Sequence, residues 1–312
     1  MHLFHYFSLS ANDSVFSLVN TKNSVNTIAE DLYIKGNFLF ADGTKLRTTN
    51  LRTVTTTHVG GESKGYNEDY GTNAEFYWIT GFVQLTPDMV VLSDAGNNCM
   101  RLVDRKTRLT SKYAGICYYS SGKGYEDGAD SKFSSPSGVI KDQVKKDMLI
   151  IADSGNNALR TMHTNDKVVT TLVKLDRLIE PQQMTQEILS GDLFITAQHS
   201  VWRFFYAEQR ISLLAGSSSA GFQDGNFRTA LFNSPWGLLK IAGEKLIIGD
   251  ESNLRLRLLD LTAKSVSSIC TGSDNTFDGK LSVCQTKMPS SMVVVGKTLY
   301  LGTKGKIRKI QG

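Results

Sequence analysis

One short pattern recurs six times along this chain of 312 residues. An apolar run that ends in a small or polar residue lies at 37–42, 89–94, 148–153, 193–197, 245–250 and 298–303. Successive copies end 52, 59, 44, 53 and 53 residues apart, so together they account for the whole chain. This repeat argues against the two separate domains that chain length alone would favour.

Each copy reads as a group of strands. The apolar runs are rich in β-branched and aliphatic residues and are bounded by turn formers, which is typical of buried strands. Three runs continue into Asp-, Gly- and Asn-rich turns at 94–98, 153–157 and 250–253, because Gly and Asn tolerate positive φ. Further strand-like stretches follow in each copy. Four strands in each repeat of about 40–50 residues predict an all-β fold, a six-bladed β-propeller with four antiparallel strands per blade.

The two ends of the chain are expected to pair. The last copy, 292–312, is too short to supply its own outer strand, and the segment 14–19 can supply it. We therefore expect a ring closed by pairing of the N- and C-terminal segments. Residues 14–312 form the predicted propeller, and 1–13 form an N-terminal extension that is either disordered or the remnant of a targeting segment.

The connections between copies carry a second signature. Gly-aromatic-x-Asp-Gly elements lie at 124–128 and 221–225, with variants at 65–69 and 277–279, and two elements lead into Phe-x-x-Pro-x-Gly segments. Together with the Asp-x-Gly-Asn turns, these segments resemble NHL repeats. The resemblance covers about four of the six copies; the connection after Val173 lacks the element, and the copy at 193–197 lacks the Asp turn. It implies a propeller with a binding face, but NHL propellers include RNA-binding domains, protein-interaction ectodomains and lyases, so function has to be argued from a site.

Side chains that recur at one position in successive copies are interpreted as structural. The recurring aspartates cap turns in preference to binding calcium: Asp42, Asp94, Asp153 and Asp250. Three arginines, each seven residues after its aspartate, are expected to bond carboxylates or carbonyls between neighbouring blades: Arg101, Arg160 and Arg257. Four aromatic residues are expected to be buried beneath the connections: Tyr66, Tyr125, Phe222 and Phe277.

No catalytic motif or cofactor site is found, so we expect no catalytic residue, no metal and no cofactor. A zinc lyase would need convergent ligands, and the propeller offers only His58, His163 and His199, none of them on an innermost strand. HExxH, GxSxG and CxxC motifs are absent from the sequence. An enzyme of lyase or hydrolase type, with a metal at the central channel, stays open as an alternative.

Binding is expected on the face where long, irregular connections gather, because loops on a rigid scaffold commonly carry recognition. We take as candidates the residues there that do not repeat, most of them aromatic, as is common at interface hot spots. These top-face candidates are Tyr118, Tyr119, Lys123, His199, Trp202 and Trp236.

The four cysteines fall into two local pairs. Cys99 begins the third strand of one blade and Cys117 ends the fourth, while Cys270 and Cys284 flank one connection. Only the pairings 99–117 and 270–284 stay within single blades, where the Cα atoms can reach disulfide distance. Two disulfides favour an extracellular or cell-surface location. Four buried free thiols in a cytoplasmic propeller remain the alternative.

The sequence thus favours a non-enzymatic recognition propeller, secreted or a receptor ectodomain, that binds a protein or glycan. The net charge of +5 forms no continuous stripe, which disfavours nucleic acid. No apolar run approaches the about 20 residues that span a bilayer. We expect a monomeric propeller, either on its own or as part of a larger protein. A cytosolic NHL scaffold or RNA-binding domain is a further alternative to the enzyme.

Overall fold

The computed structural model describes residues 13–51, 55–174, 180–272, 279–280 and 285–311. These residues form strands joined by turns, with single-turn helices η1 (Gly71–Asn73), η2 (Ala95–Asn97), η3 (Ser154–Asn156) and η4 (Glu251–Asn253). Within these ranges, no helix has the length and apolar character needed to cross a membrane. Of the expected extension 1–13, only Asp13 is described, and it is buried.

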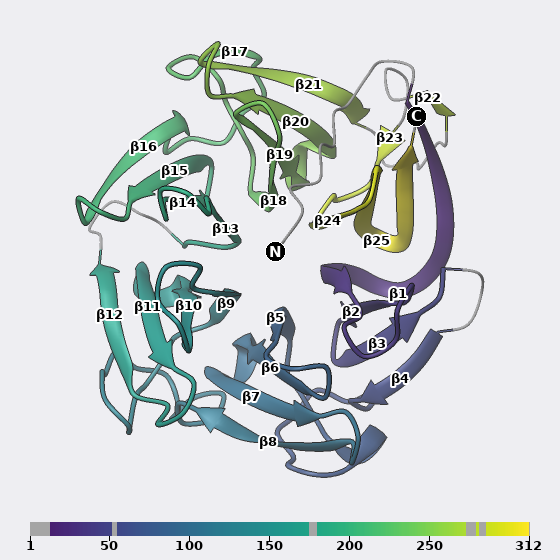
Figure 1. The fold of residues 1–312 in the computed structure, drawn as a ribbon, viewed down its shortest axis with the longest axis vertical. Coiled ribbons are helices and arrows are strands. Elements are labelled where there is room, and N and C mark those ends of the chain that lie inside the picture. Colours follow the sequence, from purple (N-terminus) through teal and green to yellow (C-terminus); the bar gives the residue numbers. More distant parts are fainter. Residues whose placement is uncertain (1–12, 52–54, 175–179, 273–278, 281–284, 312) are drawn as a thin grey trace. The chain divides into compact units, whose positions relative to one another are not determined.

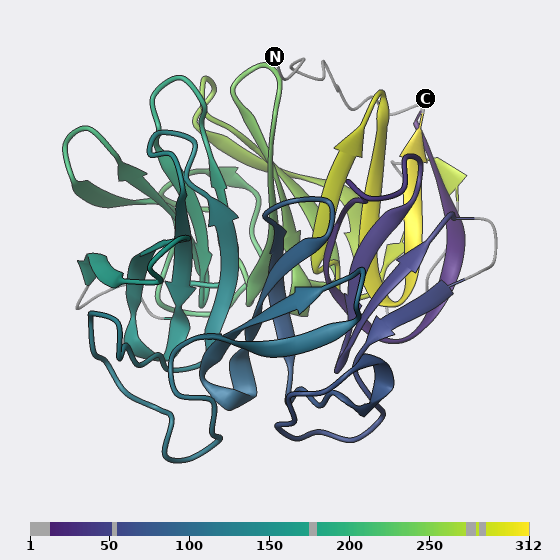
Figure 2. The same ribbon diagram turned by 60° about the horizontal axis from the view of Figure 1, so that its bottom comes forward.

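Three sheets are four-stranded antiparallel meanders (Figure 1). The first contains β5 (Ile79–Gln84), β6 (Met89–Asp94), β7 (Cys99–Asp104) and β8 (Leu109–Ala114). The second contains β9 (Pro136–Lys141), β10 (Met148–Asp153), β11 (Ala158–His163) and β12 (Val169–Lys174). The third contains β13 (Met184–Gln186), β14 (Leu193–Ala197), β15 (Ser200–Phe205) and β16 (Arg210–Gly216). Figure 2 shows the β5–β8 meander in blue.

Two sheets are larger. One has the order β17-β21-β20-β19-β18, with β23 beside β21. Its strands are β17 (Gly225–Asn226), β18 (Pro235–Ile241), β19 (Lys245–Asp250), β20 (Arg255–Asp260), β21 (Ser265–Gly272) and β23 (Gln285–Thr286). The other has the order β24-β25-β1-β2-β3-β4, with β22 on β1. Its strands are β1 (Ser14–Glu30), β2 (Phe38–Asp42), β3 (Lys45–Thr49), β4 (Thr55–Val59), β22 (Gly279–Lys280), β24 (Ser291–Val295) and β25 (Thr298–Gln311).

The all-β propeller is confirmed, but the prediction of six blades is wrong, because the described strands form five sheets. The prediction assigned one blade to each apolar run. An apolar run indicates a strand, but it does not show which strands share a sheet. The strand β1 continues for 17 residues, and the first and last copies of the run belong to the same seven-stranded sheet. The predicted pairing of the terminal segments is confirmed, since Ser14 pairs with Gln311 and Val15 with Ile310.

The chain divides into two compact units, Ala29–Met184 and Met1–Ile28 with Thr185–Gly312. The apolar runs are buried on both sides in each unit; in β6, for example, Val90, Val91 and Leu92 are all inaccessible to solvent. Full burial explains why these runs are continuously apolar and do not alternate. The site described next lies within the unit Ala29–Met184, on the β5–β8 sheet and its connections.

Candidate functional site

A buried ion pair anchors the turn between β6 and β7. Asp94 and Arg101 are both fully buried, and Arg101 Nη1 donates to Asp94 Oδ2 at 3.1 Å. Asn97 Nδ2 donates to the same oxygen at 2.8 Å, and the backbone N–H of Tyr77 donates to Oδ1 at 2.9 Å. Arg101 Nη1 also donates to the carbonyl of Glu75 at 3.2 Å, and Nη2 donates to the carbonyl of Asn67 at 2.9 Å. The carboxylate therefore ties the turn to the connection that precedes β5.

The same cluster recurs in two other sheets. Its members are Asp153, Asn156 and Arg160 in the β9–β12 sheet, and Asp250, Asn253 and Arg257 in the sheet of β18–β21. The pairing register shifts by one residue at each arginine, because the outer strand opposite it carries one extra residue. Burial raises the pKa of each aspartate, and the hydrogen bond from the asparagine and the charge of the arginine oppose that rise.

These contacts confirm that the repeated arginines bond carboxylates and carbonyls. They reach their own sheet and the connection that leads into it, however, and not a neighbouring blade as we expected. Asp42 departs from the pattern in its spacing, because its partner Arg47 follows it by five residues and not by seven, at 2.6 Å.

Each buried guanidinium lies between two aromatic side chains. Arg101 Cζ is 4.6 Å from the Tyr66 ring centroid and 5.1 Å from that of Phe76. The equivalent outer rings are Tyr125 and Phe222. Their predicted burial is wrong, since they are 36% and 46% exposed. One face covers the guanidinium and the other faces solvent; Phe277 lies outside the described residues.

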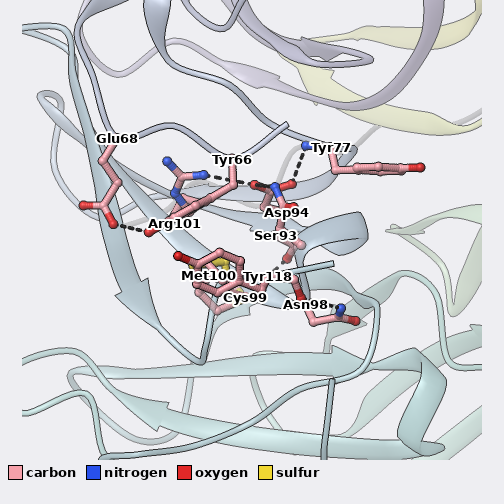
Figure 3. The surroundings of a disulfide bond; sticks show 12 residues. Tyr66, Glu68, Tyr77, Ser93, Asp94, Asn98, Cys99, Met100, Arg101 and Tyr118 are labelled. Carbon is pink, nitrogen blue, oxygen red and sulfur yellow. Dashed lines mark hydrogen bonds and ion pairs between the residues drawn. A yellow bond between two sulfur atoms is a disulfide. The ribbon is translucent and has the colours of Figure 1, made fainter. Parts of the chain in front are cut away.

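The predicted disulfide Cys99–Cys117 is confirmed, with a Cα–Cα distance of 5.1 Å (Figure 3). Cys99 begins β7 as expected, whereas Cys117 lies in the connection after the end of β8 and not on the fourth strand. Cys270 also takes part in a disulfide. Its predicted partner, Cys284, lies outside the described residues.

Five aromatic side chains lie on the segment that carries Cys117 and on the connection before β5, where they contact one another or a shared lysine, Lys64. We call them the aromatic surface: Tyr66, Tyr77, Trp78, Tyr118 and Tyr119. Tyr77 and Tyr119 stack with ring centroids 4.9 Å apart, and Tyr66 and Tyr118 meet at 5.6 Å. Tyr118, Tyr119 and Trp78 are 58%, 64% and 46% exposed. Figure 3 shows Tyr66 over Arg101 and Tyr118 close to the disulfide.

The segment that carries Tyr118 and Tyr119 is held by the backbone and by Asn98. This residue follows η2 in the left-handed conformation, and its Nδ2 donates to the carbonyls of Tyr118 and Tyr119 at 3.3 and 2.9 Å. The N–H of Gly122 donates to the Tyr118 carbonyl at 3.1 Å. Glycine is required there, because a Cβ would lie 1.9 Å from the carbonyl oxygen of Ile116. The two tyrosines are thus presented on a fixed loop.

Lys64 places a cation against the aromatic surface. Its Nζ lies 5.2 Å from the ring centroid of Tyr77 and 4.9 Å from that of Trp78. The acidic side chains nearest in sequence are engaged elsewhere, Glu62 with Lys45 and Glu68 with the Tyr66 hydroxyl. Among the residues that the structure describes, no carboxylate forms an ion pair with Lys64.

The other predicted binding residues do not join the aromatic surface. Lys123 is exposed and pairs with Phe133 in the same register in which Lys64 pairs with Phe76. Lys123 is therefore the repeat counterpart of Lys64, although the sequence analysis treated it as unrepeated.

Three predicted binding residues lie in the second unit. His199 is in the turn before β15, and its Nδ1 accepts the Ser234 N–H at 3.2 Å. Trp202 on β15 is half-buried and donates to Ser200 Oγ at 2.8 Å. Trp236 on β18 is half-buried too, and its indole nitrogen is enclosed without an acceptor among the described residues.

Sequence reasoning missed Tyr77, Trp78 and Lys64. The signal was a comparison between copies: the backbone N–H of Tyr77 and of Ser134 donates to Asp94 and Asp153 respectively, so these positions are equivalent. A Tyr-Trp pair therefore stands where the next copy has Ser134-Ser135. Large aromatic residues at small-residue positions mark a specialised copy.

The histidines have separate partners. His58 contacts Thr48 and Arg105, and burial together with Arg105 lowers its pKa to about 4. His163 lies 3.2 Å from Asp166. Among the described residues, no group of three or more His, Cys, Asp or Glu side chains is arranged to hold a metal ion.

One carboxyl group outside the predicted site residues, that of Glu251, has a shifted pKa. Glu251, at the start of η4, stands where other copies have Ala95 and Ser154. Burial raises the pKa of Glu251 to about 7, and the charge of Lys304 opposes that rise. A carboxyl group that titrates near neutral pH is suited to acid–base chemistry.

Comparison with known proteins shows the fold and leaves the family open. No family model matches the chain. The chain is 25% identical over 184 residues to the chloroplastic protein SUPPRESSOR OF QUENCHING 1 of Arabidopsis thaliana, a match that spans 50% of this chain and 17% of that protein.

Solved structures share the architecture at low identity. An auxiliary nutrient binding protein from Bacteroides thetaiotaomicron superimposes with a TM-score of 0.73 and 13% identity, over 96% of this chain and 76% of that chain. A second such protein, from Bacteroides ovatus, gives 0.69 at 13% identity with the same coverage. A streptogramin B lyase gives 0.61 at 11% identity, over 97% of this chain and 99% of that one. The chain is therefore a β-propeller similar in fold both to binding proteins and to an enzyme.

Proposed function

We propose that this propeller is a non-enzymatic recognition protein that binds a glycan through the aromatic surface. The observation that carries the proposal is the aromatic surface itself, whose five side chains are connected by ring contacts and through Lys64. Three of them are strongly exposed: Trp78, Tyr118 and Tyr119. Exposed aromatic clusters mark recognition sites more often than they serve stability.

A glycan suits this surface better than a folded protein. The faces of aromatic rings carry negative charge density, and sugar rings present weakly positive C–H groups on flat faces that stack on them. Tyrosine hydroxyls add hydrogen bonds to sugar hydroxyls. Because the disulfide and Asn98 already hold Tyr118 and Tyr119 in place, little conformational entropy is lost on binding.

We also propose that the protein works outside the cytoplasm and belongs with the NHL-type propellers that it resembles. The disulfide Cys99–Cys117 supports an oxidising compartment. The nutrient-binding function named for the two Bacteroides neighbours supports a ligand-binding role.

Glycan arrays followed by calorimetry on the full chain test the proposal. We expect Trp78→Ala and Tyr119→Ala each to weaken glycan binding at least about tenfold, the size of one interface hot spot. Tyr70→Ala is the matched control, because Tyr70 is 57% exposed and stands outside the aromatic surface. Equal binding by all three variants would reject the site. If the wild type captures a protein ligand and Trp78→Ala abolishes that capture, the ligand of the aromatic surface is a protein and not a glycan.

A second candidate function rests on Glu251. Its raised pKa of about 7 suits a general acid or base, and the streptogramin B lyase is a structural neighbour. The test is cleavage of streptogramin B by the wild type and by Glu251→Gln. Cleavage that disappears in the variant would establish an enzyme. If neither protein cleaves it, a streptogramin B lyase activity is rejected.

A further inference from the structure

The ammonium group of Lys64 gives the aromatic surface a fixed positive charge. It stands over two aromatic faces and has no ion-pair partner among the described residues. Contacts of this kind contribute about 0.5–1 kcal/mol at exposed sites, enough to favour this position of the side chain. The charge is therefore held at the place where a stacked ligand would lie.

The neighbouring copy isolates this feature. Lys123 has the same backbone register as Lys64, yet the positions that carry Tyr77 and Trp78 beneath Lys64 are Ser134 and Ser135 in its copy. A lysine at this position is thus common to both copies, whereas only one copy also has the two aromatic side chains, Tyr77 and Trp78, beneath the lysine. Lys123 is a natural control for charge without stacking.

The Lys64 ammonium beside the aromatic surface favours a negatively charged ligand over a neutral or positively charged one. A cationic ligand would have to displace Lys64 from the faces of Tyr77 and Trp78, or bind beside a like charge. A neutral sugar would leave the ammonium without a counter-charge. A carboxylate carried by a stacked sugar ring would meet the ammonium directly, in a charge-assisted hydrogen bond.

We propose that the ligand of the aromatic surface is a carboxylated glycan, in which sugar rings stack on Tyr119 and Trp78 and a uronate carboxylate pairs with Lys64. This inference rests on the proposed glycan-binding function and specifies its ligand class. Tyr118 and Tyr119 are exposed, and their hydroxyls then contact the sugar hydroxyls.

The test uses oligogalacturonate and its methyl ester, which keep the same sugar rings but differ in charge. We expect the wild type to bind the acid at least about tenfold more tightly than the ester. Affinity for the acid should also fall as salt is raised, because an exposed ion pair is screened. Lys64→Gln should bring the two affinities together, and Lys123→Gln should leave the preference intact.

Other outcomes separate the two proposals. Equal affinity for acid and ester, with both lost in Tyr119→Ala, would overturn the charge preference and keep the glycan site. Binding of polyglutamate as tight as that of oligogalacturonate would overturn the sugar class and assign an acidic peptide. Preference for the acid that persists in Lys64→Gln would show that another cation provides it and would overturn the role of Lys64.

Discussion

The β5–β8 and β9–β12 sheets share one scaffold and present different surfaces. In both, a buried aspartate binds an asparagine, an arginine and the connection before the sheet, and an aromatic ring covers the arginine. Asn98 and Asn157 both occupy the left-handed position after the turn. These contacts are the same in both copies, and the differences lie in other residues.

The copies differ in the residues that surround the shared cluster. Cys99 begins β7 where Ala158 begins β11, and Tyr77-Trp78 stands in place of Ser134-Ser135. In the first copy, Asn98 also holds the carbonyls of the two exposed tyrosines. The two copies therefore share the internal cluster, and the substitutions around it form the aromatic surface in one copy only.

The largest expected effect tests the shared scaffold. Arg101→Ala and Arg160→Ala each leave a buried aspartate without its charged partner, which costs about 3–5 kcal/mol. We expect similar losses in the free energy of unfolding for both variants, measured by urea denaturation. A loss in one copy only would show that the two clusters are not equivalent.

The next prediction concerns the disulfide that distinguishes the copies. The double variant Cys99→Ala, Cys117→Ala opens a loop with a sequence separation of 18 residues, and a loop of that size corresponds to about 3 kcal/mol of stability. Glycan affinity should fall as well, because Tyr118 loses a constraint. An unchanged denaturation midpoint would contradict the stabilising role of the crosslink.

A smaller change in stability is expected when the first copy is converted to the second. Tyr77→Ser with Trp78→Ser removes exposed and half-exposed rings, so the free energy of unfolding should change by about 1 kcal/mol or less. Glycan binding should nevertheless disappear. Circular dichroism and calorimetry on the same sample separate the effects, and retained binding would mean that Tyr118 and Tyr119 suffice.

The smallest effect is expected at high pH. Burial and the hydrogen bond to Glu68 raise the pKa of Tyr66 above its ordinary value of 10.0. The unfolded chain then releases this proton first, so stability is complete below pH 10 and falls as pH rises beyond it. Tyr66→Phe should remove this loss. Tyr125→Phe is the comparison, since its hydroxyl pairs with Thr171 and not with a carboxylate. Identical alkaline unfolding of wild type and Tyr66→Phe would refute the prediction.

Much of the scaffold could be predicted from the repeat. The repetition of Asp94 and Arg101 in later copies indicated that both residues are structural, although not that they pair with each other, and the local placement of Cys99 and Cys117 indicated a disulfide. Periodicity could not give the number of sheets, because strands from both ends of the chain share one sheet. Burial of Tyr125 was wrong because repetition shows that a residue has a structural role and does not show how much of it remains exposed.

The sequence pointed to two members of the aromatic surface and missed Tyr77 and Trp78. Tyr118 and Tyr119 stood out because their connection is long and irregular, whereas Tyr77 and Trp78 lie next to a strand that otherwise follows the repeat. Their contacts with Lys64 depend on how the connection folds back on itself before β5, where Lys64 pairs with Phe76. Alignment of one copy against the next was the step that would have revealed them.

The pairing of β1 with β25 has a consequence for synthesis. Ser14 pairs with Gln311, a separation of 297 residues (311 minus 14), so the first strand leaves the ribosome long before its partner exists. At about 5–20 residues per second, the edge of β1 waits at least about 15 seconds for that partner. Exposed edges of this kind are where chains associate wrongly, which makes the newly made N-terminal strand a natural client for chaperones.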